Sequence, residues 1–342
     1  MADQEKGDIR AHLPFRPNIS QLEHMPLLKA NSVPRYLFRL YSPNTVGTTC
    51  TSYLTPPSAN SLEPNHSKDV FSLPPDAAAW NINHHLRWWP DHEDTCNFMS
   101  WSSSLLFLLQ YALFRHTSQR DSSGFQNIHL MIIDTRKFPP RTFVKDMEII
   151  SIFAPSSREY TDQNLQRFFN LRSRPDYRFG EYLSQGDLKL TDKAVETSFE
   201  KLLCLGLFEL VPEMGNRDNW TSWVKPVLKI RQAFHEPTHP DATQTEVRKA
   251  IVIAEGAFGE PWTIPISIML LALKPRKTDD RVITEGFKAM FSVAEFQRVS
   301  LSDMYIDDDR VPENAQFRSL IGDIERYLNP EEDLHNSFRA LE

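Results

Sequence analysis

Residues 97–114 read NFMSWSSSLLFLLQYALF, and the hydrophobic pattern changes halfway along this segment. Residues 97–102 are typical of a short strand. Residues 103–116 predict a helix, because serines, which favour helix N-caps, precede a long apolar run. A strand that runs directly into a helix indicates a fold that contains both kinds of element.

Other segments on both sides of this one extend the same pattern. RYLFRLY at residues 35–41 alternates between two faces, and IHLMIIDT at residues 128–135 predicts a buried strand. RFGEYL at residues 178–183 predicts a short strand. We expect TFVKDMEIISIF at residues 142–153 to form a strand pair or a bent strand, and residues 164–174 to form a helix.

The period becomes helical after residue 190. Thr243 and Glu246, for example, have the spacing of a capping box that opens a helix. We therefore predict an α+β fold in three parts: a loose, proline-containing leader over residues 1–33, an α+β domain over residues 34–190, and an all-helical region over residues 191–342 with an acidic C-terminal segment.

The charge and the cysteines exclude several classes of protein. The net charge of −7 arises in residues 301–342, which hold 11 acidic and 4 basic side chains. The rest of the chain is balanced, so we expect no bulk binding of nucleic acid. The 3 cysteines are far apart, which indicates a reducing compartment. Without a signal peptide or an apolar run of ~20 residues, we expect a protein of the cytoplasm or nucleus that has no membrane partner.

Two histidine-rich segments raise the question of a metal site. HEPTH at residues 235–239 matches the HExxH pattern of zinc proteases, which requires both histidines on one face of a helix. Pro237 is incompatible with a helix interior, so we predict a loop that binds no zinc. The second segment has weak spacing for metal ligands and reads as a packed aromatic segment; it contains His84, His85, His92, Glu93 and Asp94. We expect no metal, and a metal-dependent hydrolase is the least favoured function.

A set of polar residues distributed over the first half of the chain carries the functional hypothesis. Arg39 lies in the early strand. Two serines precede the helix that carries Tyr111, and a late strand contains GEYLSQG at residues 180–186. The two serines are Ser100 and Ser102, and the late acidic residue is Glu181.

This order resembles the Arg–Ser–Glu class of ADP-ribosyltransferases. That family has an arginine on an early strand, an S-T-S-like strand followed by a small helix, and a late E-x-L-x-x-G strand. The resemblance covers about residues 34–190 and implies a split or bent mixed β-sheet with short helices. The chain is also similar in overall pattern to fungal proteins of no established activity that carry an LFR…SWxSSL…GEYLSQG domain.

The resemblance implies that NAD is the substrate, consumed by ADP-ribosyl transfer or by simple hydrolysis. Arg39 would hold the diphosphate, since arginine makes charge-assisted contacts to phosphate. Glu181 would be catalytic and would stabilise the oxocarbenium-like state formed when the nicotinamide–ribose bond breaks. Ser102 would be a second catalytic residue, and Ser100 and Tyr111 would contact the substrate.

The sequence departs from the family pattern at positions that leave alternatives open. Phe179 stands where arginine-directed enzymes carry a second acidic residue, which argues against arginine as the acceptor. Trp101 replaces the central threonine of the serine motif. Glu148 is a competing acidic residue, although no glycine follows it at the family spacing. The alternative function is a catalytically silent domain of the same fold that acts as a binding or regulatory module.

Overall fold

The computed structural model describes residues 12–60, 68–88, 96–157, 163–299 and 311–328. A six-stranded sheet with the order β6-β7-β4-β1-β5-β9 lies at its centre. Its strands are β1 (Tyr36–Tyr41), β4 (Phe98–Ser102), β5 (His129–Asp134), β6 (Val144–Lys145), β7 (Glu181–Gln185) and β9 (Ala194–Ser198). A smaller sheet has the order β2-β3-β8, formed by β2 (Thr48–Thr49), β3 (Tyr53–Thr55) and β8 (Leu188–Lys189).

Every strand pair that the structure describes is antiparallel. The α+β class is therefore confirmed, whereas the expectation of a mixed sheet is wrong. Antiparallel neighbours do not require the helical crossovers that parallel strands need. The strands expected around residues 35–41, 97–102 and 128–135 are present as β1, β4 and β5.

The large sheet consists of two three-stranded halves with little connection between them. β1 pairs with β5 at six positions, and β4 pairs with β7 at five. Between the halves, β1 and β4 pair at a single position, where Phe38 lies opposite Ser102. Beyond this pair the two strands separate, so the backbone of β4 near Ser100 is left without a partner from β1.

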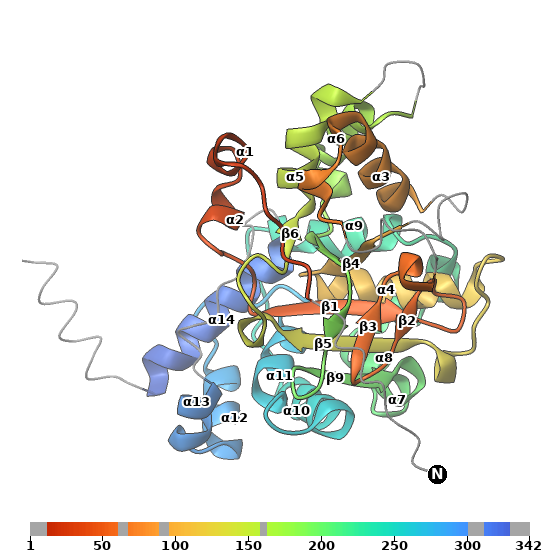
Figure 1. Ribbon diagram of the computed structural model, residues 1–342. Coiled ribbons are helices and arrows are strands. Elements are labelled where there is room, and N and C mark those ends of the chain that lie inside the picture. The colour runs from red at the N-terminus through yellow and green to blue at the C-terminus, as the bar shows by residue number, and fades with distance from the viewer. Residues whose placement is uncertain (1–11, 61–67, 89–95, 158–162, 300–310, 329–342) are drawn as a thin grey trace, which may run out of the picture.

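Each half of the sheet has its own helical cover. α3 (Pro75–Arg87), α5 (Asp146–Phe153) and α6 (Leu165–Arg172) bury a cluster with Phe98 of β4 and Leu183 of β7. Figure 1 shows these three helices gathered on one side of β1 and β5, with α10 to α13 on the opposite side. α4 (Leu105–Thr117) follows β4 directly, and the side chain of Ser104 accepts a hydrogen bond from the Phe107 N–H as its N-cap.

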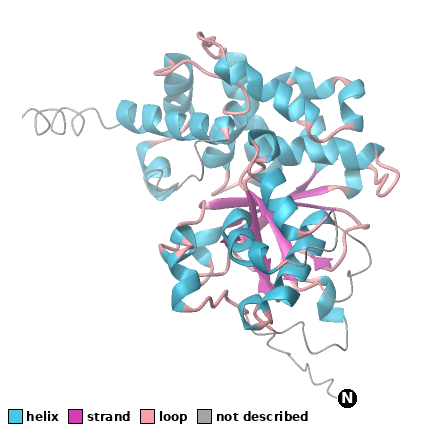
Figure 2. Cartoon of the chain, turned by 90° about the horizontal axis from the view of Figure 1, so that it is seen from above, coloured by secondary structure: helices cyan, strands magenta, loops and turns pink. Residues whose placement is uncertain are grey.

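The C-terminal helices share one hydrophobic core with β1, α4 and β5. α11 is buried along its whole length, which explains its uninterrupted apolar sequence. In Figure 2 the strands lie in the middle of the molecule with helices around them. The helices of this region are α7 (Phe199–Cys204), α8 (Leu207–Leu210), α9 (Lys225–Gln232), α10 (Gln244–Phe258), α11 (Thr263–Leu271), α12 (Arg281–Met290), α13 (Val293–Val299) and α14 (Pro312–Leu328).

Short 3₁₀ helices connect many of these elements. They are η1 (Pro57–Asn60), η3 (Val70–Ser72), η5 (Phe125–Asn127), η6 (Thr135–Lys137), η7 (Ala154–Ser156), η8 (Pro175–Tyr177), η9 (Pro212–Gly215), η10 (Arg217–Thr221) and η11 (Ala233–His235). In the part of the chain that the structure describes, no helix has the length and apolar character needed to cross a membrane.

Three expectations about local structure need correction. The leader is not loose in its described part, because α1 (Ile19–Glu23) begins with a capping box, α2 (Pro26–Lys29) follows, and Phe15 and Met25 are buried. Residues 142–153 form β6 and then helix α5, since an apolar run of this length is compatible with either element until packing decides. The region after residue 190 is not all-helical, because β9 lies within it and forms one edge of the main sheet.

Candidate functional site

A cleft of about 1210 Å³ opens where the two halves of the sheet separate. β1, β4 and β7 supply part of its wall, and α3, α4, α6 and the connecting segments supply the rest. The structure brings all of the residues singled out from the sequence to this one cleft, from positions far apart in the chain. They are Arg39, Ser100, Ser102, Tyr111 and Glu181.

Ser100 and Glu181 are in direct contact across neighbouring strands. β4 and β7 pair in a register that places Ser102 opposite Glu181, so Ser100 is the diagonal neighbour of Glu181 on the same face. The Ser100 hydroxyl donates a hydrogen bond to Glu181 Oε1 at 2.8 Å. The carboxylate is therefore held in one orientation, and its side chain remains 14% exposed toward the cleft.

Arg172 of α6 joins Glu181 to a second acidic side chain. Its Nη2 donates to Glu181 Oε2 and lies 3.0 Å from Asp146 Oδ2. Burial raises the pKa of both carboxyl groups, and their mutual repulsion adds to the rise at Glu181, against the opposing effect of the guanidinium. The sequence did not point to either partner: Asp146 lies in a segment predicted as a strand, and Arg172 lies in a predicted helix with no pattern that links it to Glu181.

Arg39 is a buried cation without a carboxylate partner among the described residues. Its Nη1 donates to the Ser100 carbonyl at 2.9 Å, which is the backbone group that the separation of β1 and β4 leaves free. Its Nε has no hydrogen-bond partner in the described structure, and the residue is only 9% exposed. Burial, together with the nearby positive charge of Arg115, lowers the Arg39 pKa to about 10. A buried, incompletely bonded guanidinium favours an anionic ligand.

Ser102 lines the same cleft but has a different environment from Ser100. Its hydroxyl donates to the Phe179 carbonyl at 2.6 Å and accepts from the Ser104 N–H at 2.9 Å. These contacts connect the end of β4 to the turn before β7, and the residue is buried. The only proton of this hydroxyl is therefore used in a structural bond. Ser100, and not Ser102, contacts the acidic residue, and the catalytic role expected of Ser102 stays a prediction.

A histidine and a cysteine continue the contacts of Ser100 away from Glu181. His85 Nε2 lies 2.9 Å from Ser100 Oγ, and His85 Nδ1 lies 3.0 Å from Cys96 Sγ. Burial and the neighbouring Arg39 charge lower the His85 pKa to about 3. Burial raises the Cys96 pKa to about 11. Both side chains are thus neutral at physiological pH. The sequence alone indicates no role for His85 other than that of a weak candidate metal ligand.

Tyr111 belongs to an aromatic wall along one side of the cleft. Its ring lies 5.3 Å from that of Trp88 and stacks on Phe107 at 5.8 Å. Phe179 and Trp223 extend the same wall, with ring centroids 5.1 Å apart. Burial raises the Tyr111 pKa to about 12. Flat aromatic surfaces of this kind are suited to stacking against a planar ring of a ligand.

Glu148, the competing acidic residue, lies in α5 and serves another purpose. Its two carboxylate oxygens accept the N–H groups of Leu27 and Leu28 at 2.7 and 3.1 Å. These are free donors in the first turn of α2, so the carboxylate caps that helix. Glu148 is absent from the cleft wall. The preference for Glu181 over Glu148 as the acidic residue of the cleft is therefore supported by position.

The two histidine-rich segments differ in their local structure. His235 is the last residue of η11, and residues 236–239 follow it without regular structure, so the loop expected for HEPTH is confirmed except at His235. Among the described residues, no group of three His, Cys, Asp or Glu side chains is arranged to hold a metal ion. His84 and His85 lie in α3, where His84 stacks on Trp80 at 4.1 Å. His92, Glu93 and Asp94 lie outside the described residues.

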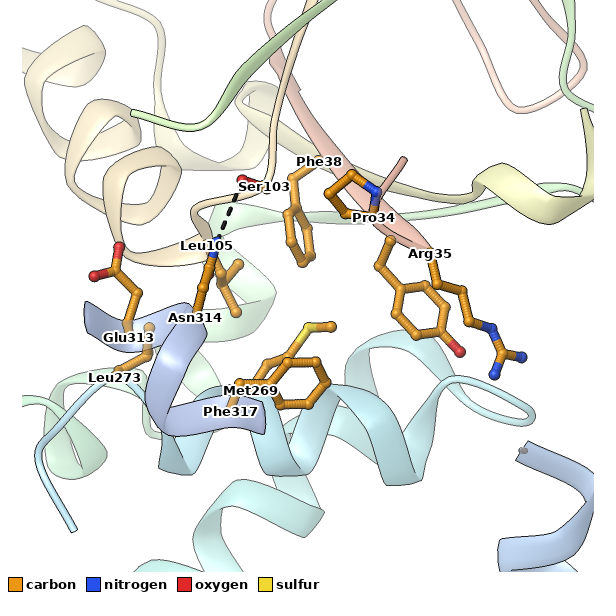
Figure 3. Close-up of a pocket in the computed structure, with 11 residues that line it drawn as sticks. Pro34, Arg35, Phe38, Ser103, Leu105, Met269, Leu273, Glu313, Asn314 and Phe317 are labelled. Atoms are coloured by element: carbon orange, nitrogen blue, oxygen red, sulfur yellow. Dashed lines mark hydrogen bonds between the residues drawn. The ribbon is translucent and has the colours of Figure 1, made fainter. Parts of the chain in front are cut away.

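A second, much smaller cavity lies between the sheet and the C-terminal helices. Figure 3 shows Phe38 and Met269 facing each other across it, with the Asn314 side chain donating to Ser103 Oγ at 3.3 Å. Its volume of about 30 Å³ leaves room for water but not for a ligand of the size of a dinucleotide.

Comparison with known protein families matches part of the chain. Residues 32–186, a little under half of the chain, are similar to a family described as a domain of unknown function (DUF7587). The matched segment runs from just before β1 to the end of β7 and contains Arg39, Ser100 and Glu181. No curated protein and no solved structure shows significant similarity to the chain.

Proposed function

We propose that the cleft binds NAD and cleaves its nicotinamide–ribose bond, with transfer of ADP-ribose to an acceptor or to water. The observation that carries this proposal is the orientation of Glu181 by Ser100 in the same cleft as the buried Arg39. A dinucleotide needs a cation for its diphosphate and a carboxylate near its reacting ribose. The cleft offers both, and its volume of about 1210 Å³ is ample for a ligand of that size.

Arg39 is the proposed diphosphate ligand. Its Nη1 is fixed by the Ser100 carbonyl, whereas its Nε is buried without a partner in the described structure. A phosphate group beside this guanidinium would offset the cost of burying its charge. The aromatic wall that contains Tyr111 would stack against one of the two flat rings of NAD.

Glu181 is the proposed catalytic residue. The bond between the ribose C1′ and the nicotinamide nitrogen breaks, and its electron pair leaves with neutral nicotinamide. The ribose is left with oxocarbenium character, which a carboxylate stabilises. Water or the acceptor then bonds to C1′ and releases a proton. A carboxylate has about four acceptor sites, so the contacts with Ser100 and Arg172 leave room for a ribose hydroxyl.

The division of the sheet into two three-stranded halves supports an ADP-ribosyltransferase-like fold. The halves meet at a single residue pair, Phe38 with Ser102, and the cleft opens beside it. The weak connection between the halves supports the proposal of a split sheet, which the resemblance implies. Phe179 stands where arginine-directed enzymes carry an acidic residue, so we propose water or an acceptor other than an arginine side chain.

One observation favours the silent-module alternative. The ion pair with Arg172 already compensates the charge of Glu181, which would reduce the help that the carboxylate gives to a developing positive charge. A module of this kind would bind NAD at Arg39 and leave it intact. The two functions therefore differ in whether nicotinamide is released, not in whether the cleft is filled.

The test is incubation of the full chain with NAD, with nicotinamide release followed by chromatography and binding followed by tryptophan fluorescence. Trp88 and Trp223 line the cleft and would report its occupation. Nicotinamide release supports the enzyme. Quenching without release supports the silent module. Absence of both contradicts the proposal that NAD is the ligand of this cleft.

A further inference from the structure

The contacts of Ser100 form one chain of hydrogen bonds that runs from Glu181 into the wall of the cleft. Ser100 Oγ lies 2.8 Å from Glu181 Oε1 and 2.9 Å from His85 Nε2. His85 Nδ1 in turn lies 3.0 Å from Cys96 Sγ. Four side chains from α3, β4, β7 and the segment before β4 are thereby connected in a fixed order.

The direction of each hydrogen bond follows from the number of protons available. A serine hydroxyl has one proton, and Ser100 donates it to Glu181. His85 must therefore carry its proton on Nε2 and donate it to Ser100 Oγ. In a neutral imidazole the other nitrogen, Nδ1, then accepts, and the Cys96 thiol is the donor that faces it. The Phe98 carbonyl lies farther from Cys96 Sγ, at 3.8 Å, and competes weakly for the thiol proton.

We propose that His85 is a positioning residue for the reaction at Glu181, and that it acts by donating Nε2–H to Ser100 and so directs the serine proton onto the carboxylate. Cys96 selects the required tautomer of His85 by donating to Nδ1. This inference rests on the proposed NAD-cleaving function for its kinetic consequence, but the tautomer of His85 is a property of the protein itself.

The arrangement explains why a neutral histidine is held beside a buried arginine. If His85 carried its proton on Nδ1, its Nε2 lone pair would accept the Ser100 proton and draw it away from Glu181. The carboxylate would then lose one of the two contacts that fix its orientation, and only Arg172 would remain. A small rotation of a catalytic group costs much of its effect, because the group must lie correctly in the transition state.

The kinetic test compares two substitutions at one position. His85→Gln keeps an N–H donor near the Nε2 position, whereas His85→Leu removes it. We expect His85→Leu to lower kcat for nicotinamide release roughly 10-fold with KM for NAD little changed, and His85→Gln to restore most of the loss. His129→Leu is the control, because His129 lies on β5 outside the cleft, where its ring stacks on that of Tyr41, and this variant should retain kcat. Equal losses in His85→Gln and His85→Leu would overturn the proposal.

The second test needs no enzyme activity. Nitrogen NMR of the histidines in the full chain at pH 7 should show His85 neutral and protonated on Nε2. Cys96→Ala should weaken that preference, and Cys96→Ser, which keeps a donor, should preserve it. A proton on Nδ1, or an imidazolium, overturns the proposal. If the wild-type protein releases no nicotinamide, the proposed function fails by that result, whereas the tautomer alone still decides whether His85 directs Ser100.

Discussion

Ser100 Oγ and Glu181 Oε1 lie 2.8 Å apart across the β4–β7 pair, although 80 residues separate the two in sequence. Their contact is diagonal, because the residue directly opposite Glu181 is Ser102. The two serines point to the same face of the sheet, yet they bond to different groups. The structure therefore separates a serine that orients the carboxylate from a serine that holds the chain.

Alanine substitutions at the two serines should affect different properties, activity in one case and stability in the other. Ser100→Ala removes the contact with Glu181, and we expect nicotinamide release to fall roughly 10-fold with stability little changed. Ser102→Ala leaves the Phe179 carbonyl and the Ser104 N–H without their partner and should lower the free energy of unfolding by about 1–3 kcal/mol. Urea denaturation and steady-state kinetics measure both. A loss of activity in Ser102→Ala and a loss of stability in Ser100→Ala would instead assign the catalytic role to Ser102.

Arg39 should govern NAD affinity. Arg39→Ala removes the buried guanidinium, and we expect the Kd for NAD to rise roughly 10-fold or more, because charge-assisted contacts to phosphate are strong. Arg120→Ala is the control, since Arg120 also lines the cleft but is exposed and screened by solvent. Fluorescence titration measures both. Equal, small effects from the two substitutions would show that Arg39 is not the phosphate ligand.

A buried ion pair connects the C-terminal helices to the cleft segments. Arg231 of α9 pairs with Glu313 of α14 at 2.7 Å, and the same guanidinium donates to the Arg178 carbonyl just before β7. Glu313 also accepts from the Ser104 hydroxyl at 2.5 Å. Glu313→Gln should lower the free energy of unfolding by about 3 kcal/mol, because it leaves a buried cation without its counter-charge.

The matched double variant of this ion pair is the control. Arg231→Met combined with Glu313→Leu removes both charges, and we expect it to be more stable than either single variant with one charge left buried. Urea denaturation of the wild type, Arg231→Met, Glu313→Leu and the double variant completes the cycle. Strictly additive losses would show that the two side chains do not depend on each other.

His85 should make the protein sensitive to acid. Its pKa is about 3 in the folded chain, against 6.5 when unfolded, so between these values the unfolded chain binds a proton that the folded chain does not. The free energy of unfolding then falls as pH falls, by up to about 1.4 kcal/mol per pH unit from this residue. His85→Gln should show a shallower decline between pH 6.5 and pH 4 in thermal unfolding. Parallel curves for the two proteins would contradict the low pKa.

The sequence predicted those parts of the site that depend on local pattern. Arg39 and Ser100 were recognisable because β1 and β4 have strand-like patterns and β4 runs into a capped helix. Glu181 was recognisable because a glycine follows it at the family spacing. The sheet was expected to be split, and the single β1–β4 pair is consistent with this.

The rest depends on contacts between segments distant in sequence. The roles of Ser100 and Ser102 differ only through what β7 and the Phe179 turn place beside them. Arg172 and Asp146 meet Glu181 because α5 and α6 pack on β7, and the apolar run of α5 did not distinguish helix from strand. The link between α14 and Ser104 crosses more than 200 residues, and no local pattern predicts it.

The measurement that tests the central claim most directly is nicotinamide release from NAD by the wild-type chain, Glu181→Gln and Glu148→Gln. Glu181→Gln keeps the shape of the side chain but removes its charge, so we predict a fall in turnover of roughly two to three orders of magnitude with NAD affinity little changed. Glu148→Gln, which alters a helix cap outside the cleft, should leave turnover close to that of the wild type. Release that survives Glu181→Gln, or is abolished by Glu148→Gln, would contradict the assignment of Glu181 as the catalytic residue.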